Sequence, residues 1–221
     1  MDISLADILP PYSKTRPIHT SRLILRPFQW TDLQAVHELR TRPEVMQWTS
    51  QVQIDSSIQQ TRTWMERYIN DNETSRQNFN FIVTVQPDNP DKFSPNSFLE
   101  DKSALIGVCG LVAWDDSQKY PLPLFGYMFL PETWGKGYAT EAALGFQQEW
   151  KRLIDFGLQA RSIDNQSRLD LYDLYAVTLE TNVPSANVLR KCGWCTYEAA
   201  DEGNQKTLKW ILRDRPVSFA P

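Results

Sequence analysis

The sequence predicts an α/β fold in which helices flank a mixed, mostly antiparallel sheet of about seven strands. Apolar runs of strand length recur along the chain, and three of them follow one another over residues 78–130 with no helical segment between them. Segments with apolar positions three or four residues apart separate the other runs and predict helices. With 221 residues and no internal repeat, the chain fits one domain over 20–213, between an irregular lead-in over 1–19 and a tail over 214–221.

The first part of this domain is predicted to hold one strand and two helices. Residues 22–26 form a short apolar run that is typical of a strand. Thr31 and Asp32 form an N-cap signal, so we expect a helix over 33–40 to begin directly after them. A second helix is expected over 55–69, because its apolar positions lie on one helical face.

Three strands are expected in the middle of the chain, over 78–85, 105–114 and 124–130. The first two are joined by a segment over 86–103 that is rich in Pro, Asp and Asn, which predicts a long loop. We expect these two strands to pair in the antiparallel direction, with the third strand following directly.

The last part of the chain is predicted to alternate helices and strands. Pro184 suits the first turn of one helix, and Gly193 suits the left-handed position after its end. The expected elements are a helix over 142–153, a polar loop over 156–170, a strand over 174–179, a helix over 183–192, and a terminal strand pair over 194–199 and 206–212 around a turn at 201–204.

The segment Pro131–Glu141, here called the glycine loop, is the most informative stretch of the sequence. It reads PETWGKGYATE and joins a predicted strand to a predicted helix. Gly135 and Gly137 let the main chain turn tightly and approach a ligand closely. The N–H groups of the first helical turn lack partners inside the helix and attract phosphate together with the helix dipole. The alternative is an ordinary strand-to-helix turn whose glycines serve geometry alone.

Composition excludes several classes of protein. A formal net charge of −4 argues against a general nucleic-acid-binding protein, but it is compatible with a local basic pocket for an anionic cofactor. The amino terminus lacks the basic start and apolar core of a signal peptide. No apolar run approaches the ~20 residues that a membrane span needs. We therefore expect a soluble, cytoplasmic protein that acts as a monomer or homodimer, without nucleic acid or membrane as a partner.

The cysteines predict structural thiols and no metal site. Cys192 and Cys195 have C-x-x-C spacing, and Cys109 lies elsewhere in the chain. A thioredoxin-type motif would need a helix that begins after the first cysteine, and a zinc site would need a second pair of ligands. The predicted helix instead ends at Cys192, and the chain's two histidines are His19 and His37. We expect a structural or surface role for His37.

Three signatures follow one another in order along the chain. Residues 21–27 form the first, and Gly126-Tyr127 followed by residues 134–142 (WGKGYATEA) forms the second. Asn182-x-x-Ser185 followed by residues 188–194 (VLRKCGW) forms the third. Together they resemble the GCN5-related N-acetyltransferase (GNAT) superfamily, in particular the branch that includes ribosomal-protein alanine N-acetyltransferases. The resemblance covers about residues 20–213 and implies the GNAT fold and an acetyl-CoA-dependent N-acetyltransferase.

The resemblance also implies where acetyl-coenzyme A (acetyl-CoA) lies. Its pyrophosphate would be held by main-chain N–H groups of the glycine loop, in agreement with the anion site argued above. Its pantetheine arm would lie in a wedge between the strand over 124–130 and the splayed strand over 174–179, and pair with main chain as a strand would. The implied cofactor-binding residues are Met128, Phe129, Leu130, Gly135, Lys136, Gly137, Tyr138, Ala139, Thr140, Asn182, Ser185 and Arg190.

Several of these side chains have a simpler alternative role. Lys136 is also compatible with a solvated loop position, and Ser185 with a helix cap. Arg190 and Lys191 could reach the phosphates of the nucleotide or remain surface charges. Asn182, at the end of the splayed strand, is carried over as a polar contact to the pantetheine arm.

The chain departs from the family pattern at positions that bear on catalysis. Glu132 stands three residues before the first loop glycine, where relatives often carry Gln or Arg, so the loop must rely on main-chain donors. Leu124 and Phe125 occupy places where many relatives have a carboxylate. Leu189 replaces a tyrosine that acts as general acid in many relatives, although that branch often lacks it. The easiest catalytic assignment is therefore absent.

We expect the acetyl group to pass directly from the thioester to a primary amine. A main-chain N–H near Phe129 would stabilise the charge that develops on the carbonyl oxygen. Ser185 is the candidate for protonating the thiolate, and Glu180 and Asp115 are the candidate bases. Both carboxylates are also compatible with a solvated role.

The acceptor is expected to be a protein amino terminus or a small amine. Trp30, Trp48 and Trp64 could line its groove or pack in the core. The alternative function is a non-catalytic CoA-binding module of the same fold. A phosphotransferase is not favoured, because the loop lacks the G-x-x-x-x-G-K-[ST] spacing.

Overall fold

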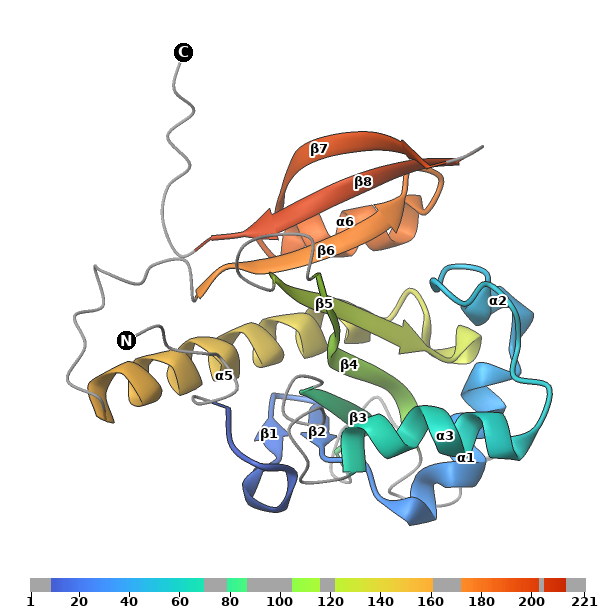
Figure 1. Cartoon of the computed structure of the whole chain (residues 1–221), viewed down its shortest axis with the longest axis horizontal. Coiled ribbons are helices and arrows are strands. Elements are labelled where there is room, and N and C mark those ends of the chain that lie inside the picture. Colours follow the sequence, from blue (N-terminus) through green and yellow to red (C-terminus); the bar gives the residue numbers. More distant parts are fainter. Residues whose placement is uncertain are drawn as a thin grey trace.

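The computed structural model describes residues 9–69, 79–86, 105–115, 122–160, 172–202 and 205–213. Within them, eight strands form one sheet in the order β1-β2-β3-β4-β5-β6-β8-β7 (Figure 1). The strands are β1 (Ile18–His19), β2 (Leu23–Arg26), β3 (Asn80–Val85), β4 (Leu105–Asp115), β5 (Leu122–Phe129), β6 (Leu174–Leu179), β7 (Cys195–Glu202) and β8 (Gln205–Leu212). The predicted fold class is confirmed. The strand beyond the expected seven is β1, which lies in the segment predicted to be irregular.

Neighbouring strands pair in the antiparallel direction, except where β5 meets β6. The pair β5–β6 is parallel and is registered at a single position of the described strands, Leu124 opposite Tyr175. Figure 1 shows the two strands diverging from there toward their carboxyl ends. This gap, here called the wedge, is the splay that the sequence resemblance implied.

Helices cover both faces of the sheet. They are α1 (Leu33–Arg40), α2 (Pro43–Met46), α3 (Ile58–Ile69), α5 (Tyr138–Ala160) and α6 (Val183–Lys191), with short 3-10 helices η2 (Tyr12–Lys14), η3 (Trp30–Asp32) and η4 (Pro131–Thr133). Alternate side chains of β3 pack into two different hydrophobic cores, because successive side chains of a strand point to opposite faces of the sheet. Phe81 packs with Phe146 of α5, whereas Ile82 packs in the cluster that contains Val36 and Leu39 of α1.

Helix α5 is longer than the helix predicted over 142–153. It begins at Tyr138, directly after Gly137, whose φ of +79° cannot belong to a right-handed helix. It ends at Ala160, so residues 156–160 of the predicted loop are helical. The remainder of that loop lies outside the described residues, as do residues 87–103 of the predicted insert, 203–204 of the last turn, and the tail.

Helix α1 begins at Leu33, directly after Asp32 as predicted, but the side chain of Asp32 forms no capping hydrogen bond with it. The carboxylate of Asp32 accepts hydrogen bonds from Arg26, at 2.6 and 2.8 Å, and from the main-chain N–H of Gln29, at 2.8 Å. Gln29 is the N-cap of η3, and the short helix η3 leads into α1. The carboxylate of Asp32 therefore stabilises the turn before α1 and an ion pair with Arg26, and it does not bond the first turn of α1.

Candidate functional site

A cleft of about 710 Å³ opens along β5, beside the wedge. Its described lining comes from β5 and β6, the glycine loop, α6, and the segment that runs from α1 to α3. A cleft of this size, with apolar walls and a few polar groups, is typical of a small-molecule site. The described chain thus brings the second and third sequence signatures together in one cleft.

The glycine loop presents main-chain donors to this cleft. Gly135 and Gly137 have φ values of +75° and +79°, in the left-handed region that favours glycine. A Cβ atom added to Gly135 would meet no protein atom within 4 Å, so the space in front of it is open. The N–H of Glu141 donates to the carbonyl of Gly137 at 3.0 Å. The N–H groups of Ala139 and Thr140 come before this bond in the first turn of the helix, where N–H groups lack partners inside the helix. The geometry is that of an anion site at a helix N-terminus.

Arg22 and Glu141 hold the glycine loop against the start of β2 and are here called the Arg22–Glu141 clamp. The carboxylate of Glu141 accepts three hydrogen bonds: from Arg22 Nε at 2.7 Å, from the main-chain N–H of Arg22 at 2.7 Å, and from Thr20 Oγ1 at 2.6 Å. Arg22 Nη1 also donates to the carbonyl of Lys136 at 3.1 Å, and the guanidinium lies 4.8 Å from the centre of the Tyr138 ring. The sequence signatures contained both clamp residues, but sequence reasoning gave neither of them a role.

The clamp also determines the ionisation of Glu141. Burial alone would raise the pKa of this carboxyl group, but the hydrogen bonds from Thr20, Arg22 and Ser21 outweigh burial and lower the pKa below its ordinary value of 4.5. Glu141 is therefore a carboxylate at neutral pH, held by its donors.

One edge of β5 faces the wedge. Leu130 donates its N–H to the carbonyl of Ile106 on β4 at 2.9 Å, so the predicted main-chain contact of Leu130 with a cofactor is not available. Because residues of an antiparallel pair alternate in direction, the main-chain groups of Tyr127 and Phe129 point the other way, toward the wedge. The carbonyl of Phe129 accepts a hydrogen bond from Trp134 Nε1 at 2.8 Å. The N–H of Phe129 is then the donor that this edge offers beside the glycine loop.

Tyr127 and Ser185 meet across the wedge. Their hydroxyl oxygens lie 2.7 Å apart. Burial raises the pKa of the Tyr127 hydroxyl above its ordinary value of 10, and the bond to Ser185 offsets this only in part. The side-chain oxygen of Asn182 accepts the N–H of Ser185 at 3.2 Å and caps α6. Asn182, not Ser185, therefore supplies the cap, and Ser185 directs its hydroxyl to Tyr127.

Most of the predicted cofactor-binding residues line the cleft. They are Met128, Phe129, Gly135, Gly137, Tyr138, Ala139, Thr140, Asn182 and Ser185. Leu130, Lys136 and Arg190 are not among its lining residues. Arg190 donates to Asn187 at 3.0 Å and lies over the Trp210 ring, while its neighbour Lys191 lines the cleft.

The predicted base Glu180 does not line the cleft. Glu180 is exposed and is absent from the described lining, because it follows β6 on the side of Lys206, whose carbonyl accepts the Glu180 N–H at 2.8 Å. The side chain of Asp115 lies outside the described residues. Two departures from the family pattern have a structural explanation. Phe125 is buried against Trp194, with ring centres 5.4 Å apart, and Leu189 is buried as well.

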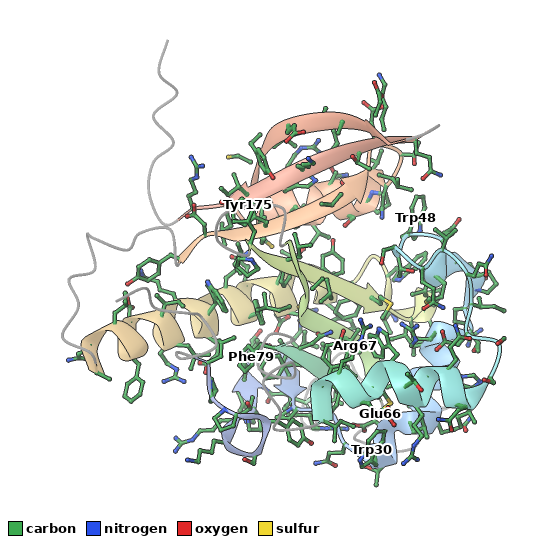
Figure 2. All side chains as sticks on the ribbon, viewed as in Figure 1. Trp30, Trp48, Glu66, Arg67, Phe79 and Tyr175 are labelled. Carbon is green, nitrogen blue, oxygen red and sulfur yellow. The ribbon has the colours of Figure 1, made fainter. Side chains whose placement is uncertain are left out.

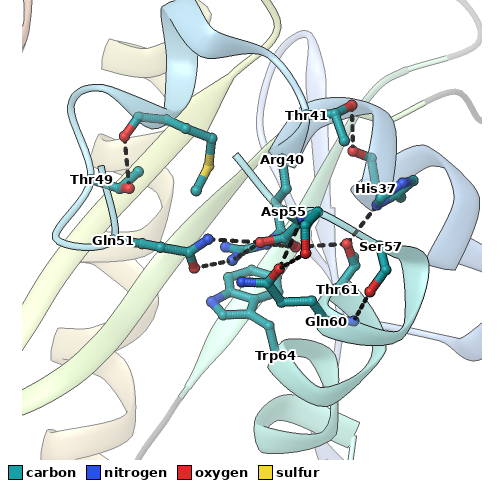
Figure 3. A network of polar contacts seen from close by, with 12 residues as sticks. His37, Arg40, Thr41, Thr49, Gln51, Asp55, Ser57, Gln60, Thr61 and Trp64 are labelled. Carbon is teal, nitrogen blue, oxygen red and sulfur yellow. Dashed lines mark hydrogen bonds and ion pairs between the residues drawn. The ribbon is translucent and has the colours of Figure 1, made fainter. Parts of the chain in front are cut away.

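A polar network fixes the other end of the cleft, between α1 and the start of α3 (Figure 3). Arg40 Nε lies 2.7 Å from the carboxylate of Asp55, and both side chains are almost completely buried. Asp55 also accepts bonds from Thr61 at 2.7 Å and Gln51 at 2.8 Å. Burial raises the pKa of Asp55, but these bonds outweigh it and lower the pKa. Nδ1 of His37 lies 2.7 Å from Thr61 Oγ1, so His37 joins this structural network and not the cleft.

Two of the three candidate tryptophans line this end. Trp48 and Trp64 border the cleft together with Tyr68, and the guanidinium of Arg40 lies 4.3 Å from the centre of the Trp64 ring. Trp30 does not border the cleft, and the guanidinium of Arg62 lies 4.6 Å from the centre of its ring. Trp48 and Trp64 therefore remain candidates for the predicted acceptor groove, and Trp30 does not.

In the part of the chain that the structure describes, no three His, Cys, Asp or Glu side chains gather as metal ligands would. Among the described helices, none is both long and apolar enough to span a bilayer.

The match to a family model decides which class of protein this is. The model of the acetyltransferase (GNAT) domain matches residues 22–194. The chain belongs to the GNAT family. The predicted enzyme class, an acetyl-CoA-dependent N-acetyltransferase, is the class to which this family belongs.

This GNAT protein is similar to several known proteins. It is 26% identical to the uncharacterized N-acetyltransferase YnaD of Bacillus subtilis (strain 168) over 177 residues, which cover 80% of this chain and 81% of YnaD. The structure of a ribosomal-protein-S5-alanine acetyltransferase from Vibrio fischeri matches with a TM-score of 0.57 at 16% identity, over 94% of this chain and 100% of that one. A Vibrio cholerae spermidine N-acetyltransferase, solved with CoA and spermine, matches with a TM-score of 0.55 at 16% identity, over 88% and 96%. These structures share the fold of this chain.

Proposed function

We propose that this GNAT protein transfers the acetyl group of acetyl-CoA directly to a primary amine. The observation that carries the proposal is the glycine loop, whose open space in front of Gly135 and first-turn donors face the wedge. A diphosphate fits there, because it needs several N–H donors and no side chain in its place. Similar folds solved with CoA, from a spermidine acetyltransferase and a ribosomal-protein L7/L12 acetyltransferase, support the assignment.

The wedge would take the pantetheine arm. It offers the main-chain edge of β5 at Tyr127 and Phe129, and its far wall is α6. The oxygen of Asn182 is used to cap α6, which leaves its NH₂ group for the arm. Lys191 supplies a positive charge on the wall of the cleft for the phosphates.

Three groups of this chain would act on the reaction. Acetyl-CoA supplies an activated thioester when bound. The N–H of Phe129 stabilises the negative charge on the carbonyl oxygen during attack. The Tyr127 hydroxyl, kept protonated by its raised pKa, donates a proton toward the leaving sulfur, and Ser185 orients that hydroxyl at 2.7 Å. The pair takes the place of the missing tyrosine at Leu189.

The proton of the attacking amine would leave through water. No carboxylate is present among the described residues that line the cleft, and Glu180 is exposed outside it. An exposed cleft mouth allows a water molecule to relay the proton, so a dedicated base is not required by this geometry.

A Gly135→Val variant tests the proposal. The valine side chain would enter only the open space of the proposed diphosphate site, so acetyl-CoA should no longer raise the melting temperature, and thiol release with amines should stop. Gly193→Val is the matched control, because Gly193 has a similar φ of +85° and does not line the cleft. The control shares the backbone strain but should keep the response to acetyl-CoA.

Two results would count against this function. If Gly135→Val still gained stability from acetyl-CoA, the diphosphate would not lie on the glycine loop. If the native protein bound acetyl-CoA but released no thiol with any amine of a panel of peptides, amino acids and polyamines, the non-catalytic CoA-binding module would be the better assignment.

A further inference from the structure

The charges along the cleft have one sign. Its described lining includes Arg40, Arg67 and Lys191 but no Asp or Glu. The whole chain carries a formal net charge of −4, so this lining is opposite in sign to the protein as a whole. A cleft lined by one sign of charge concentrates ligands of the other sign. The sign is a property of the site and not of overall composition.

The three cations are not equivalent. Arg40 is neutralised by the buried carboxylate of Asp55, at 2.7 Å. Lys191 is on α6, at the end of the cleft where the phosphates of acetyl-CoA are placed. Arg67 is on α3, at the opposite end. Arg67 is therefore the cation of this lining that faces the acceptor without a buried counter-charge.

Arg67 is exposed and lies beside an aromatic wall. Its guanidinium lies 5.9 Å from the centre of the Trp64 ring and 5.7 Å from that of Tyr68, and Nε donates weakly to the carbonyl of Trp64 at 3.5 Å. It forms no ion pair with a carboxylate of the described residues. Figure 2 shows Arg67 on the side of α3 that faces the central strands, whereas Trp30 lies on the other side. An arginine beside flat rings offers forked donors for a carboxylate and a surface for an apolar group.

We infer that the acceptor is a small primary amine that carries a carboxylate and an apolar or aromatic body, as an aromatic amino acid does. This inference rests on the proposed acetyl transfer and names the substrate class of the same site. Arg67 binds the carboxylate, and Trp48, Trp64 and Tyr68 contact the body. A polyamine is disfavoured, because each further ammonium group would lie among cations with no described carboxylate to receive it.

Binding to the CoA complex tests this inference directly. Phenylalanine, phenylalanine amide and spermidine are titrated against the protein saturated with CoA, with tryptophan fluorescence as the readout. Phenylalanine should bind about tenfold more tightly than its amide, the size of one charge-assisted hydrogen bond, and spermidine should bind most weakly. Equal affinity for acid and amide, or a preference for spermidine, would overturn the inference.

Two variants of α3 localise the effect. Arg67→Gln should lower the affinity for phenylalanine about tenfold and leave the affinity for its amide unchanged. Arg62→Gln is the matched control, because Arg62 lies on the same helix, pairs with Glu66 at 3.9 Å and does not line the cleft. If both variants lowered the affinity for phenylalanine equally, Arg67 would not bind the carboxylate and the inference would be wrong.

Turnover separates this inference from the proposed function. Selective binding of phenylalanine without acetylation would contradict acetyl transfer and keep the anion subsite. Acetylation of spermidine or of phenylalanine amide at a higher kcat/KM than phenylalanine would keep acetyl transfer and overturn the acceptor class. An unchanged response to acetyl-CoA in Arg67→Gln confirms that the variant is folded.

Discussion

Tyr127 and Ser185 come from different elements and meet because the start of α6 packs beside β5. Their hydroxyl groups lie 2.7 Å apart, although 58 positions separate them in the chain. In our proposal, the pair compensates for Leu189, a buried leucine at the place where many relatives carry a general acid. Burial keeps the Tyr127 hydroxyl protonated, which a proton donor requires.

Replacing Tyr127 with Phe should lower kcat about 100-fold, because the leaving sulfur loses its proton donor while the ring stays in place. The KM for acetyl-CoA should change little. Tyr175→Phe, at a position on β6 that does not line the cleft, is the control and should keep full activity. Steady-state kinetics of thiol release measure both, and an unchanged kcat in Tyr127→Phe would remove this residue from the mechanism.

At this scale, local signals were predictable from sequence and tertiary ones were not. The tight turn at Gly135 and Gly137 was predicted because its signal is local, and both residues have positive φ values. The exclusion of Glu180 from the cleft and the position of Arg67 inside it depend on where β6 and α3 lie in the fold. No local pattern contains that information, so both required the structure.

At the scale of elements, the Arg22–Glu141 clamp joins the start of β2 to the start of α5. The carboxylate receives four donors from residues 20–22, which lie some 120 positions earlier in the chain. The same arginine bonds the carbonyl of Lys136 inside the glycine loop. The clamp therefore fixes the orientation of the N–H groups on which anion binding depends, and a loop fixed in advance loses less entropy on binding.

Glu141→Gln should destabilise the protein by about 1–2 kcal/mol at neutral pH, because the charge-assisted bonds of the clamp are lost. The folded-state pKa of Glu141 lies below 4.5, so its stabilising contribution is complete above that pH and is lost as pH falls through the lower value. The difference between native protein and variant should therefore shrink as the pH falls below 4.5.

Urea unfolding at several pH values measures this difference. Glu149→Gln is a matched control on the same helix, because Glu149 pairs with Arg152 at the surface and such pairs contribute about 0–1 kcal/mol. A pH-independent gap for Glu141→Gln would show that the clamp stabilises through shape and not through charge.

The starts of two helices differ from the predicted ones, because interactions that the sequence does not reveal compete with the local helix signals. The expected start of α5 at residue 142 missed its first turn, because Tyr138–Glu141 look like loop sequence until Gly137 is known to be left-handed. Asp55 was expected in the first turn of α3, but the helix begins at Ile58 because Asp55 is bound to Arg40. Ion pairs thus shifted the start of α3, and at Asp32 the pair with Arg26 took the carboxylate away from capping α1, although α1 begins where predicted.

At the scale of the whole molecule, the sheet consists of two parts that meet at the wedge. Strands β1–β5 form one part and β6–β8 the other, and the described strands are registered across the junction at one pair. The junction is closed by side chains on one face, where Phe125 of β5 stacks on Trp194 and contacts Phe146 of α5. An open β5–β6 edge gives a ligand main-chain partners, and the aromatic contacts supply the cohesion that hydrogen bonds do not.

Phe125→Ala should therefore destabilise the whole protein by about 3–5 kcal/mol, because it removes a buried ring and leaves a cavity at the junction. Acetyl-CoA lies across the same junction in our proposal, so a saturating concentration, near 100 times Kd, should restore about 2.7 kcal/mol of apparent stability. Val177→Ala is the control, because Val177 lies on β6 beside the wedge but is 49% exposed. Urea unfolding with and without acetyl-CoA measures both variants. Equal losses in the two would show that the junction is held by the β5–β6 main chain rather than by Phe125.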